Sequence, residues 1–453
     1  MNPYSLIKSF QDKALLVEYS ELLSNKEILI QHNNELKSFS KSKFEAYSVR
    51  TFVKGAFGFS STSNPKELPR IFKESYNLAL NASRNKLHKS EFKELDYSVD
   101  NVKSSVKEDP FTMSDEEKLS FVSNVNKIYS SKEIKDIESS TSFTKRISTY
   151  ANSRGGRIVQ NDNYTGFSSV IVGGENLETA SVRKYAKLGF ELFKKFDVNK
   201  ALLEVEEKLI RLIRAPYAKP GVYDLVLDPD IAGIFFHEAL GHALEADTIR
   251  EKSTCIALSD KVGPDFLTLV DDPTIPDKWG SFAYDDEGMK SKHSTLKKEG
   301  VVVNFINDYS SYLDVPGLVK TSNGRAETPH SIPIPRMSNT VVKKGSMAKD
   351  ELISHVKDGL LVAGFAGGAV EPLTRVFSFK APEAFVIKDG KIEGSIKGVT
   401  LSGDLKTLLM NITNIGKETL DGLTGGFCGK KGQHIPVAQD VPYMSVRGVS
   451  VGN

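Results

Sequence analysis

A short segment with two histidines, set in an apolar stretch, most constrains what this chain can fold into. Residues 237–242 read His-Glu-Ala-Leu-Gly-His, and the residues before them are mostly apolar. Two neutral imidazoles and a nearby carboxylate are the groups with which a zinc hydrolase binds its ion and takes a proton from water. The usual helical pattern is H-E-x-x-H, and here one more residue separates Glu238 from His242. The segment therefore predicts a metal site on a helix of unusual geometry.

The extra residue predicts a local distortion of that helix. Successive residues of an α-helix are about 100° apart around the axis, so His237 and His242 would point roughly 140° away from each other. A π-helical bulge returns the two side chains to one side, and such bulges are frequent at functional sites. Gly241 directly precedes the second histidine, and glycine tolerates unusual backbone angles. We expect the distortion at this glycine.

The residues before the motif predict a strand, a turn and then the helix. Val222 to Leu227 read as a buried strand. Asp228 can cap a helix N-terminus with its side chain, and Pro229 suits the first helical position. We therefore expect the motif helix to begin at about residue 229.

The motif lies in the second of two predicted domains. Prolines and glycines between 215 and 221 interrupt the pattern of regular elements, and we place the boundary there. The prediction is an α+β fold with an N-terminal α/β domain at 1–215 and a strand-rich C-terminal domain at 216–453 that carries the metal-site helix. Further strands are predicted at 44–53, 157–172, 266–270, 300–306, 384–388 and 391–396, with a hairpin turn at Asp389-Gly390, and further helices at 66–82, 114–129, 177–195 and 199–213.

Composition and charge argue against several classes of protein. The 60 Lys and Arg against 58 Asp and Glu leave a net charge of +2, so we expect no direct binding of nucleic acid. We expect no membrane span, because no apolar run reaches the roughly 20 residues needed, and the N-terminus lacks a signal-peptide core. The two cysteines are too few for a disulfide framework and fit a reducing compartment. A cytoplasmic location is the expectation.

A zinc ion bound by two histidines usually takes a third protein ligand. Candidates are the remaining histidines and Cys255, Cys428, Glu245 and Asp247. Glycines flank Cys428 and let the backbone bend, and the lysines that follow would favour the thiolate. A small buried residue in a glycine-rich turn explains Cys428 equally well on chemistry alone. Glu245 and Asp247 either contact the histidine ligands or cap and solvate the end of the helix.

Several blocks in order resemble the TldD/PmbA family of metalloproteases, and within it the TldD-like branch that carries the metal motif. The resemblance spans 216 to 442, and the N-terminal half is similar only around 49–59. Phe427 stands where the family often has Met. The blocks are 237–247, Asn323-Gly-Arg-Ala-Glu327, Pro333-Ile-Pro-Arg-Met-Ser-Asn-Thr340, Gly367-Gly-Ala-Val370, Phe427-Cys-Gly-Lys430 and Gly432-Gln433.

The resemblance implies a ligand set, a catalytic group and a partner. His237, His242 and Cys428 match the family's metal ligands, and Glu238 matches its catalytic carboxylate. One Zn²⁺ per chain is implied, with another divalent ion left open. The family also implies a peptidase that acts on short or unfolded peptides, as the catalytic subunit of a heterodimer with a metal-free TldE/PmbA-like chain.

Substrate binding and three alternatives stay open at this point. Arg325, His330 and Arg336 lie in a proline-punctuated segment that either lines a substrate groove or is a structural loop. An extended peptide could also add to an exposed sheet edge as a strand. The alternatives are a metal-dependent hydrolase of a non-peptide amide, a non-enzymatic regulatory binding protein, and a purely structural metal site.

Overall fold

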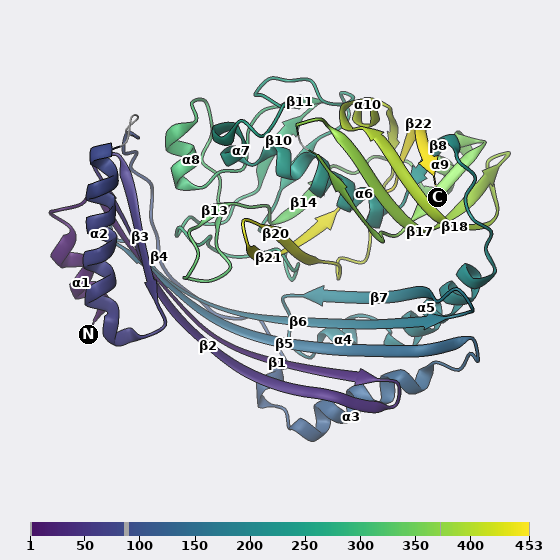
Figure 1. Ribbon diagram of the computed structural model, residues 1–453, viewed down its shortest axis with the longest axis horizontal. Helices are drawn as coiled ribbons and strands as arrows, with labels where there is room; N and C mark the ends of the chain where they lie inside the picture. The colour runs from purple at the N-terminus through teal and green to yellow at the C-terminus, as the bar shows by residue number, and fades with distance from the viewer. Residues whose placement is uncertain (1, 86–89, 372, 453) are drawn as a thin grey trace.

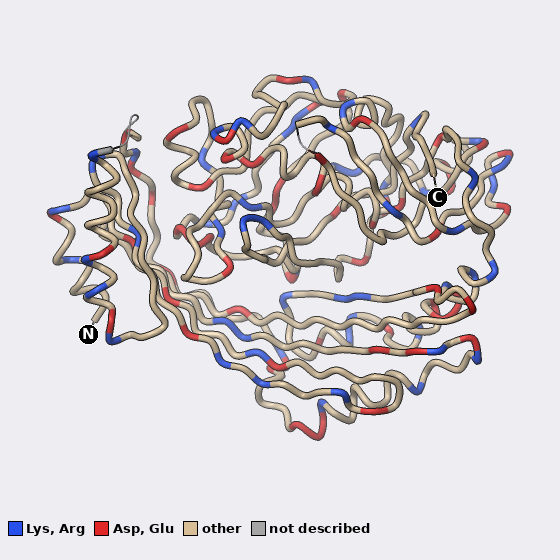
Figure 2. Tube along the Cα trace, in the orientation of Figure 1, with Lys and Arg blue, Asp and Glu red and all other residues tan. Residues whose placement is uncertain are grey.

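The computed structural model describes residues 2–85, 90–371 and 373–452. A long curved N-terminal sheet wraps one side of the molecule, and the C-terminal part lies against its concave face (Figure 1). Strands and helices are mixed without regular alternation, which confirms the predicted α+β class. Acidic and basic residues are interspersed along the whole chain (Figure 2). None of the described helices combines the length and apolar character that would span a bilayer.

The N-terminal sheet has the strand order β3-β2-β1-β5-β6, and both β4 and β7 pair with β6. Helix α2 packs on β2 and β3, and α5 packs on β6 and β7. The strands are β1 (Leu16–His32), β2 (Glu35–Val53), β3 (Ala56–Thr62), β4 (Val99–Val102), β5 (Ile134–Asn152), β6 (Arg157–Gly173) and β7 (Glu178–Ala186). The helices are α1 (Pro3–Phe10), η1 (Pro65–Glu67), α2 (Leu68–Asn85), η2 (Pro110–Thr112), α3 (Asp115–Val125), η3 (Asn126–Ile128), α4 (Leu192–Lys195) and α5 (Val198–Arg214).

Local signals predict α2, α3, α5, β6 and the second half of β2, and they contain one clear error. The predicted helix at 177–195 is wrong: its first half is β7, and only α4 at its end is helical. Strand β7 pairs with β6 over its full length, and Ala180 packs into the core beneath α5. Without β7, this part of β6 would have an edge of unpaired backbone groups, so sheet pairing overrides the helical pattern.

The C-terminal part contains two large sheets and a short one. A seven-stranded sheet has the order β15-β8-β22-β18-β17-β16 with β19 on β22, and a six-stranded sheet has the order β11-β10-β9-β14-β21-β20. The strands are β8 (Gly221–Leu227), β9 (Leu269–Asp271), β10 (Ser294–Lys298), β11 (Val301–Val302), β12 (Gly324–Arg325), β13 (Ile334–Pro335), β14 (Asn339–Val342), β15 (Gly359–Ala363), β16 (Gly367–Val370), β17 (Val376–Lys388), β18 (Lys391–Asp404), β19 (Ile412–Ile415), β20 (Gly426–Lys430), β21 (Gln433–Asp440) and β22 (Met444–Gly452). The helices are α6 (Pro229–Phe235), η4 (Phe236–Gly241), η5 (His242–Leu244), α7 (Ala246–Glu251), α8 (Tyr309–Asp314), α9 (Lys349–Val356) and α10 (Leu405–Met410).

Turn chemistry is predicted better than strand length. The hairpin at Asp389-Gly390 is confirmed: both residues have positive φ, 47° and 71°, as a type I′ turn between β17 and β18 requires. The predicted strand at 300–306 is too long, because the strand covers only Val301–Val302, and beyond it Ile306 makes a single bridge to Glu245. The predicted division at 215/216 stays a prediction; there the chain passes from α5 to β8.

Helix α6 lies inside the main apolar core, between the two large sheets. Phe235 and Phe236 are buried, and the Phe235 ring packs against Phe377 and Phe379 of β17 at centroid distances of 5.8 and 6.0 Å. The same cluster takes in residues of β8, β10, β18, β21 and β22. The helix that carries the histidine motif is therefore held on several sides by packed side chains.

Lys297 of β10 is a fully buried lysine whose Nζ has no hydrogen-bond partner among the described residues. Burial lowers the pKa of this ammonium to about 7. The unfolded chain binds the proton more tightly, so stability is lost as the pH falls from about 10 toward 7. The lowered pKa reduces the free energy of unfolding by about 4 kcal/mol at pH 7.

We expect Lys297→Met to raise the free energy of unfolding at pH 7, and the gain over wild type to shrink toward pH 10. Urea titrations at pH 7, 8.5 and 10 measure this. The adjacent Lys298 is exposed, so Lys298→Met is a matched control that should leave stability unchanged. A gain that is the same at all three pH values would contradict the argument.

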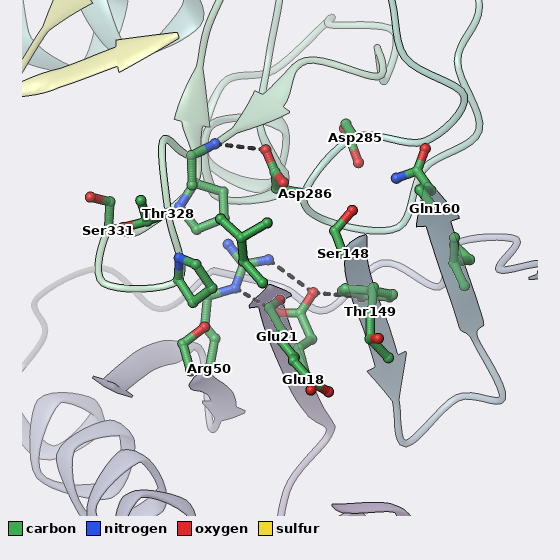
Figure 3. A pocket seen from close by; sticks show the side chains of 18 of the residues that line it. Glu18, Glu21, Arg50, Ser148, Thr149, Gln160, Asp285, Asp286, Thr328 and Ser331 are labelled. Carbon is green, nitrogen blue, oxygen red and sulfur yellow. Dashed lines mark hydrogen bonds and ion pairs between the residues drawn. The ribbon is translucent and has the colours of Figure 1, made fainter. Parts of the chain in front are cut away.

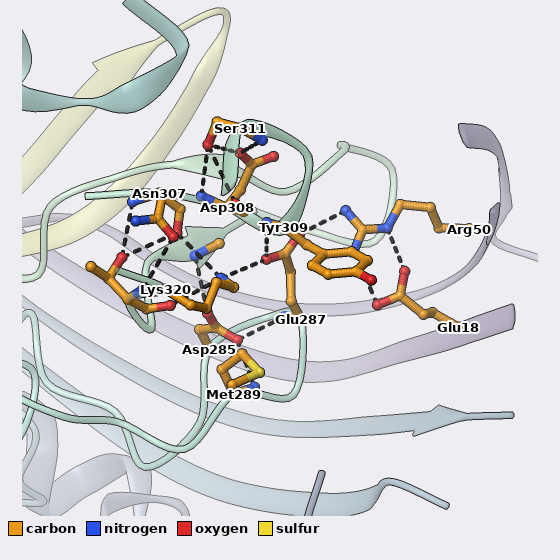
Figure 4. A network of polar contacts seen from close by, with 12 residues as sticks. Glu18, Arg50, Asp285, Glu287, Met289, Asn307, Asp308, Tyr309, Ser311 and Lys320 are labelled. Atoms are coloured by element: carbon orange, nitrogen blue, oxygen red, sulfur yellow. Dashed lines mark hydrogen bonds and ion pairs between the residues drawn. The ribbon is translucent and has the colours of Figure 1, made fainter. Parts of the chain in front are cut away.

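A buried ion-pair network joins the N-terminal sheet to the C-terminal part (Figure 4). Nε of Arg50, on β2, lies 2.5 Å from a Glu18 carboxylate oxygen on β1, and Nη1 lies 2.7 Å from Glu287. Lys320 lies 3.3 Å from the other oxygen of Glu287. The side chains of all four residues are 7% exposed or less. Arg50 therefore ties the curved sheet to the body that carries the histidine motif.

A small pocket of about 50 Å³ lies beside this network, between the N-terminal sheet and the loop at 326–333 (Figure 3). The sheet contributes Glu18, Ser148 and Gln160, and the C-terminal part contributes Asp286 and Thr328. The two parts therefore enclose a polar space at their junction.

Candidate metal centre

The local sequence builds the motif helix as predicted. Strand β8 ends in buried apolar residues, and Oδ1 of Asp228 then accepts hydrogen bonds from the backbone N–H groups of Asp230 and Ile231 at 3.1 and 3.0 Å. Pro229 is the first residue of α6. A side-chain acceptor at the cap satisfies donors that the first helical turn leaves open. The predicted helix start at 229 is confirmed.

The predicted π-helical distortion is also confirmed, since residues 236–241 form the π-helix η4. It brings the His237 and His242 rings onto one side, 5.2 Å apart between centroids. The reason given for Gly241 is wrong, because its φ of −57° and ψ of −56° are ordinary helical angles. A Cβ there would instead overlap the sulfur of buried Met337. Glycine at 241 permits close packing rather than an unusual backbone.

Strand β20 brings Cys428 to the two histidines across 186 residues of sequence. Its Sγ lies 3.2 Å from Nε2 of His242. One ligand atom from each of His237, His242 and Cys428 lies within 4.8 Å of the others. His237 and Cys428 are 2% and 6% exposed, whereas Cys255 is exposed and does not join the cluster. The fold thus brings Cys428 to the histidines and leaves Cys255, which the sequence places in a polar loop, outside the cluster.

The cluster favours a thiolate at Cys428. Burial alone would raise the pKa of this thiol, but hydrogen bonds and charges from His237 and His242 outweigh that effect and lower the pKa to about 5. The lysines after Cys428 were expected to supply this effect, but their ammonium groups pair with acidic side chains instead. A thiolate is the form of cysteine that binds a metal.

The three residues fit a zinc ion on their own geometry and chemistry. Tetrahedral zinc separates nitrogen and sulfur ligand atoms by roughly 3.3 to 3.6 Å, close to the 3.2 Å between Cys428 and His242. Nδ1 of His237 is buried and has no hydrogen-bond partner among the described residues. None of these residues therefore competes with a metal ion for this nitrogen. Two imidazoles and a thiolate suit zinc and other borderline divalent ions.

Glu238 lies beside the cluster without belonging to it. Its side chain is 38% exposed, and one carboxylate oxygen lies 3.9 Å from Nε2 of His242. An exposed carboxylate at this distance can reach a small molecule at the cluster while leaving the three candidate ligands in place. This is the placement that a proton-transferring group needs.

Glu245 holds the far side of the His242 ring. This glutamate is fully buried, and its Oε2 lies 2.9 Å from Nδ1 of His242 and 2.8 Å from Nζ of Lys430. Burial would raise the pKa of Glu245, but His242 and Lys430 outweigh it and lower the pKa to about 2. Of the two readings of Glu245, contact with one of the motif histidines is the one seen in the structure. Asp247 instead pairs with lysines.

The three predicted groove residues have different surroundings. Arg336 is fully buried and donates to the backbone carbonyls of Cys428 and Gln433 at 2.5 and 3.2 Å. Arg325 is 7% exposed and donates to the carbonyls of Met337 and Pro436. Arg336 holds the backbone of β20 and β21, and Arg325 links β21 to the segment before β14. The sequence around Arg336 gave no sign of this contact with the Cys428 strand.

His330 is exposed and lies on the N-terminal sheet. Its Nε2 and Nδ1 are 2.9 and 3.1 Å from the hydroxyls of Ser63 and Ser61, and its ring meets Phe44 edge-on. The loop that carries His330 therefore docks onto β2 and β3. The structure does not bring His330 into the His–His–Cys cluster.

Two histidines on a distorted helix and a cysteine on β20, with a carboxylate beside them, are the groups expected of a metal-dependent hydrolase. The chain belongs to the PmbA/TldD family of metallopeptidases. Residues 220–453 match the PmbA/TldA metallopeptidase C-terminal domain, and residues 28–79 match domain 1 of the same family. The protein is thus a metalloprotease of this family.

Curated relatives agree with this assignment, and solved structures share the fold. A metalloprotease of Methanothermobacter thermautotrophicus is 29% identical over 99% of this chain and 98% of its own length, and one of Methanocaldococcus jannaschii is 31% identical over 89% and 90%. A zinc metalloprotease TldD homologue of Saccharolobus solfataricus is 29% identical over 67% and 68%. A Thermotoga maritima crystal structure and TldE of Thermococcus kodakarensis share the fold, with TM-scores of 0.80 and 0.74, 16% and 17% identity, and 99% coverage of each chain.

Proposed function

We propose that this chain is the metal-bearing, TldD-like member of the family, a zinc-dependent peptidase that hydrolyses short or unfolded peptides. The observation that carries the proposal is the convergence of His237, His242 and Cys428 within 4.8 Å, with the Glu238 carboxylate at their edge. A relative named as a zinc metalloprotease supports the choice of metal. His237, His242 and Cys428 are the proposed ligands of one ion, and Glu238 is the proposed catalytic residue.

The chemistry follows from the placement of the side chains. A bound zinc ion supplies Lewis acidity toward the scissile carbonyl and the attacking water. Glu238 takes the proton from that water and passes it to the leaving amine. Because the carboxylate is not one of the three proposed ligands, it is free to move the proton between the two sites. Glu245 keeps the His242 ring oriented through its Nδ1.

The edge of the seven-stranded sheet supports a peptide substrate in extended form. Strand β16 (Gly367–Val370) ends the described strand order and lies against η4, which carries the histidine motif. Gly368 and Ala369 at its centre are exposed. An extended peptide that adds to this edge would be held by its backbone, which gives binding with little dependence on side chains.

We further propose that the chain works in the cytoplasm, with a metal-free TldE/PmbA-like subunit as its partner. The shared fold of a solved TldE supports the idea of two related subunits, and the two cysteines suit a reducing compartment. Assays of unstructured peptides against small amides, with and without such a subunit, test substrate class and partner together. Hydrolysis of the small amides alone would contradict a peptide substrate.

Elemental analysis of the purified chain tests the metal site. We expect about one equivalent of zinc in the wild type, and its loss in Cys428→Ser and His242→Ala, because each variant removes one proposed ligand. Cys255→Ser is the matched control and should keep its metal, since Cys255 is exposed and lies outside the cluster. Full retention of zinc by Cys428→Ser, or no metal in zinc-supplied wild type, would overturn the proposed ligand set.

A further inference from the structure

Four side chains close a ring between strand β20 and the metal-site helix. Cys428 and Lys430 are two residues apart on β20, so they project from the same face of the strand. Sγ of Cys428 lies 3.2 Å from Nε2 of His242, whose Nδ1 lies 2.9 Å from Oε2 of Glu245. Nζ of Lys430 donates to that same oxygen at 2.8 Å. The strand and the helix segment are thus joined at two points, through the Cys428–His242 contact and the Lys430–Glu245 contact.

The ion pair between Lys430 and Glu245 is largely shielded from solvent. Glu245 is fully buried, and its second oxygen, Oε1, has no hydrogen-bond partner among the described residues. Oε2 therefore serves both His242 and Lys430. The Lys430 side chain is 14% exposed and also reaches Oδ1 of Asp247 at 2.7 Å. Without this ammonium, two carboxylates would lie buried with less compensation, which is costly.

We propose that Lys430 is a positioning residue for the metal centre. By holding Glu245, it fixes the ring orientation of His242 and ties β20 to the helix, which sets Cys428 opposite His242. The inference rests on the proposed function, because it takes these two residues as metal ligands. Partners that orient a metal ligand from outside typically contribute about 10- to 100-fold in metal affinity.

The neighbouring Lys431 provides a matched control within the same hairpin. It carries the same charge and pairs with Oδ2 of Asp247 at 2.9 Å and with Glu251. Its side chain is 41% exposed, and its ion pairs are with Asp247 and Glu251 rather than Glu245. Lys431→Met therefore removes one positive charge and one bond to Asp247, and it leaves the ring through His242 intact.

The test is a cobalt(II) titration of the metal-free full chain, read by the thiolate-to-cobalt charge-transfer band and by competition with a chelator. We expect Lys430→Met to bind cobalt about 10- to 100-fold more weakly and to show a weaker thiolate band. Lys431→Met should stay within about threefold of wild type, because Asp247 keeps Lys430 and the bonds of Glu245 to His242 and Lys430 are untouched. Thermal melting followed by circular dichroism shows whether each variant is folded, and Lys430→Gln, which keeps a polar donor, gives the same comparison if Lys430→Met does not fold.

The outcomes separate this inference from the proposed function. A wild-type titration without a thiolate band would mean that Cys428 is not a ligand, and the proposed function would fall together with the inference. A normal wild-type band, with Lys430→Met equal to Lys431→Met in affinity and spectrum, would overturn the positioning role alone. A selective loss in Lys430→Met is the result that supports it.

Discussion

Glu238→Gln should lower the rate of peptide hydrolysis by about 10²- to 10⁴-fold, the usual contribution of a positioned acid–base group. The amide has nearly the shape of the carboxylate but cannot accept the proton of the attacking water. The proposed ligands are untouched, so metal content should stay at the wild-type level. Steady-state kinetics with an unstructured peptide, together with elemental analysis of the same samples, measure both effects.

A second glutamate tests whether the loss is specific to Glu238. Glu251 lies at the end of α7 and pairs with Lys431 at the surface, so Glu251→Gln should keep the wild-type rate. A wild-type rate in Glu238→Gln would show that another group moves the proton. Loss of metal from Glu238→Gln would show instead that Glu238 contributes to binding the ion, and would change its assigned role.

Arg50→Met should destabilise the protein by about 3 to 5 kcal/mol, as expected when one partner of a buried ion pair is removed. Arg50 is 6% exposed and joins Glu18 of the N-terminal sheet to Glu287 of the C-terminal part. Glu287 would keep Lys320, but Glu18 would lose the two hydrogen bonds that Arg50 makes to it. The apparent free energy of unfolding from urea titration measures the loss.

The control for Arg50 is a surface arginine with the same kind of partners. Arg70 pairs with Glu67 and Glu74, and its side chain is 53% exposed. Arg70→Met should leave the urea midpoint unchanged, because exposed ion pairs contribute little to stability. Equal effects of the two substitutions would mean that the network of Figure 4 does not stabilise the junction of the two parts.

Features that depend on a few neighbouring residues could be predicted from the sequence. The five-residue spacing of His237 and His242 required a bulge, because an α-helix sets the angle between any two positions. Asp228 followed by Pro229 marked the start of α6, and Asp389-Gly390 marked a hairpin. The bulge, the helix start and the hairpin each follow from the backbone angles that the residues there allow. Distant parts of the chain therefore have little effect on them.

Features that depend on pairing between distant segments could not be predicted in the same way. The segment at 178–186 has a helical pattern, yet it forms β7 because the exposed edge of β6 is available to it. The sequence left Arg325 and Arg336 between a substrate groove and a structural loop, and in the fold they donate to backbone carbonyls of Pro436 on β21 and Cys428 on β20. Nothing near these residues in sequence reveals such partners.

The sequence by itself determined the distorted histidine helix and the donor types around it, because spacing and side-chain chemistry are local properties. Only the tertiary structure decided how Cys428 lies against the histidines, and that Glu245 and Lys430 close a ring behind them. These contacts span more than 180 residues. They form because packing of α6 between two sheets brings β20 to the helix, and that packing depends on the whole core.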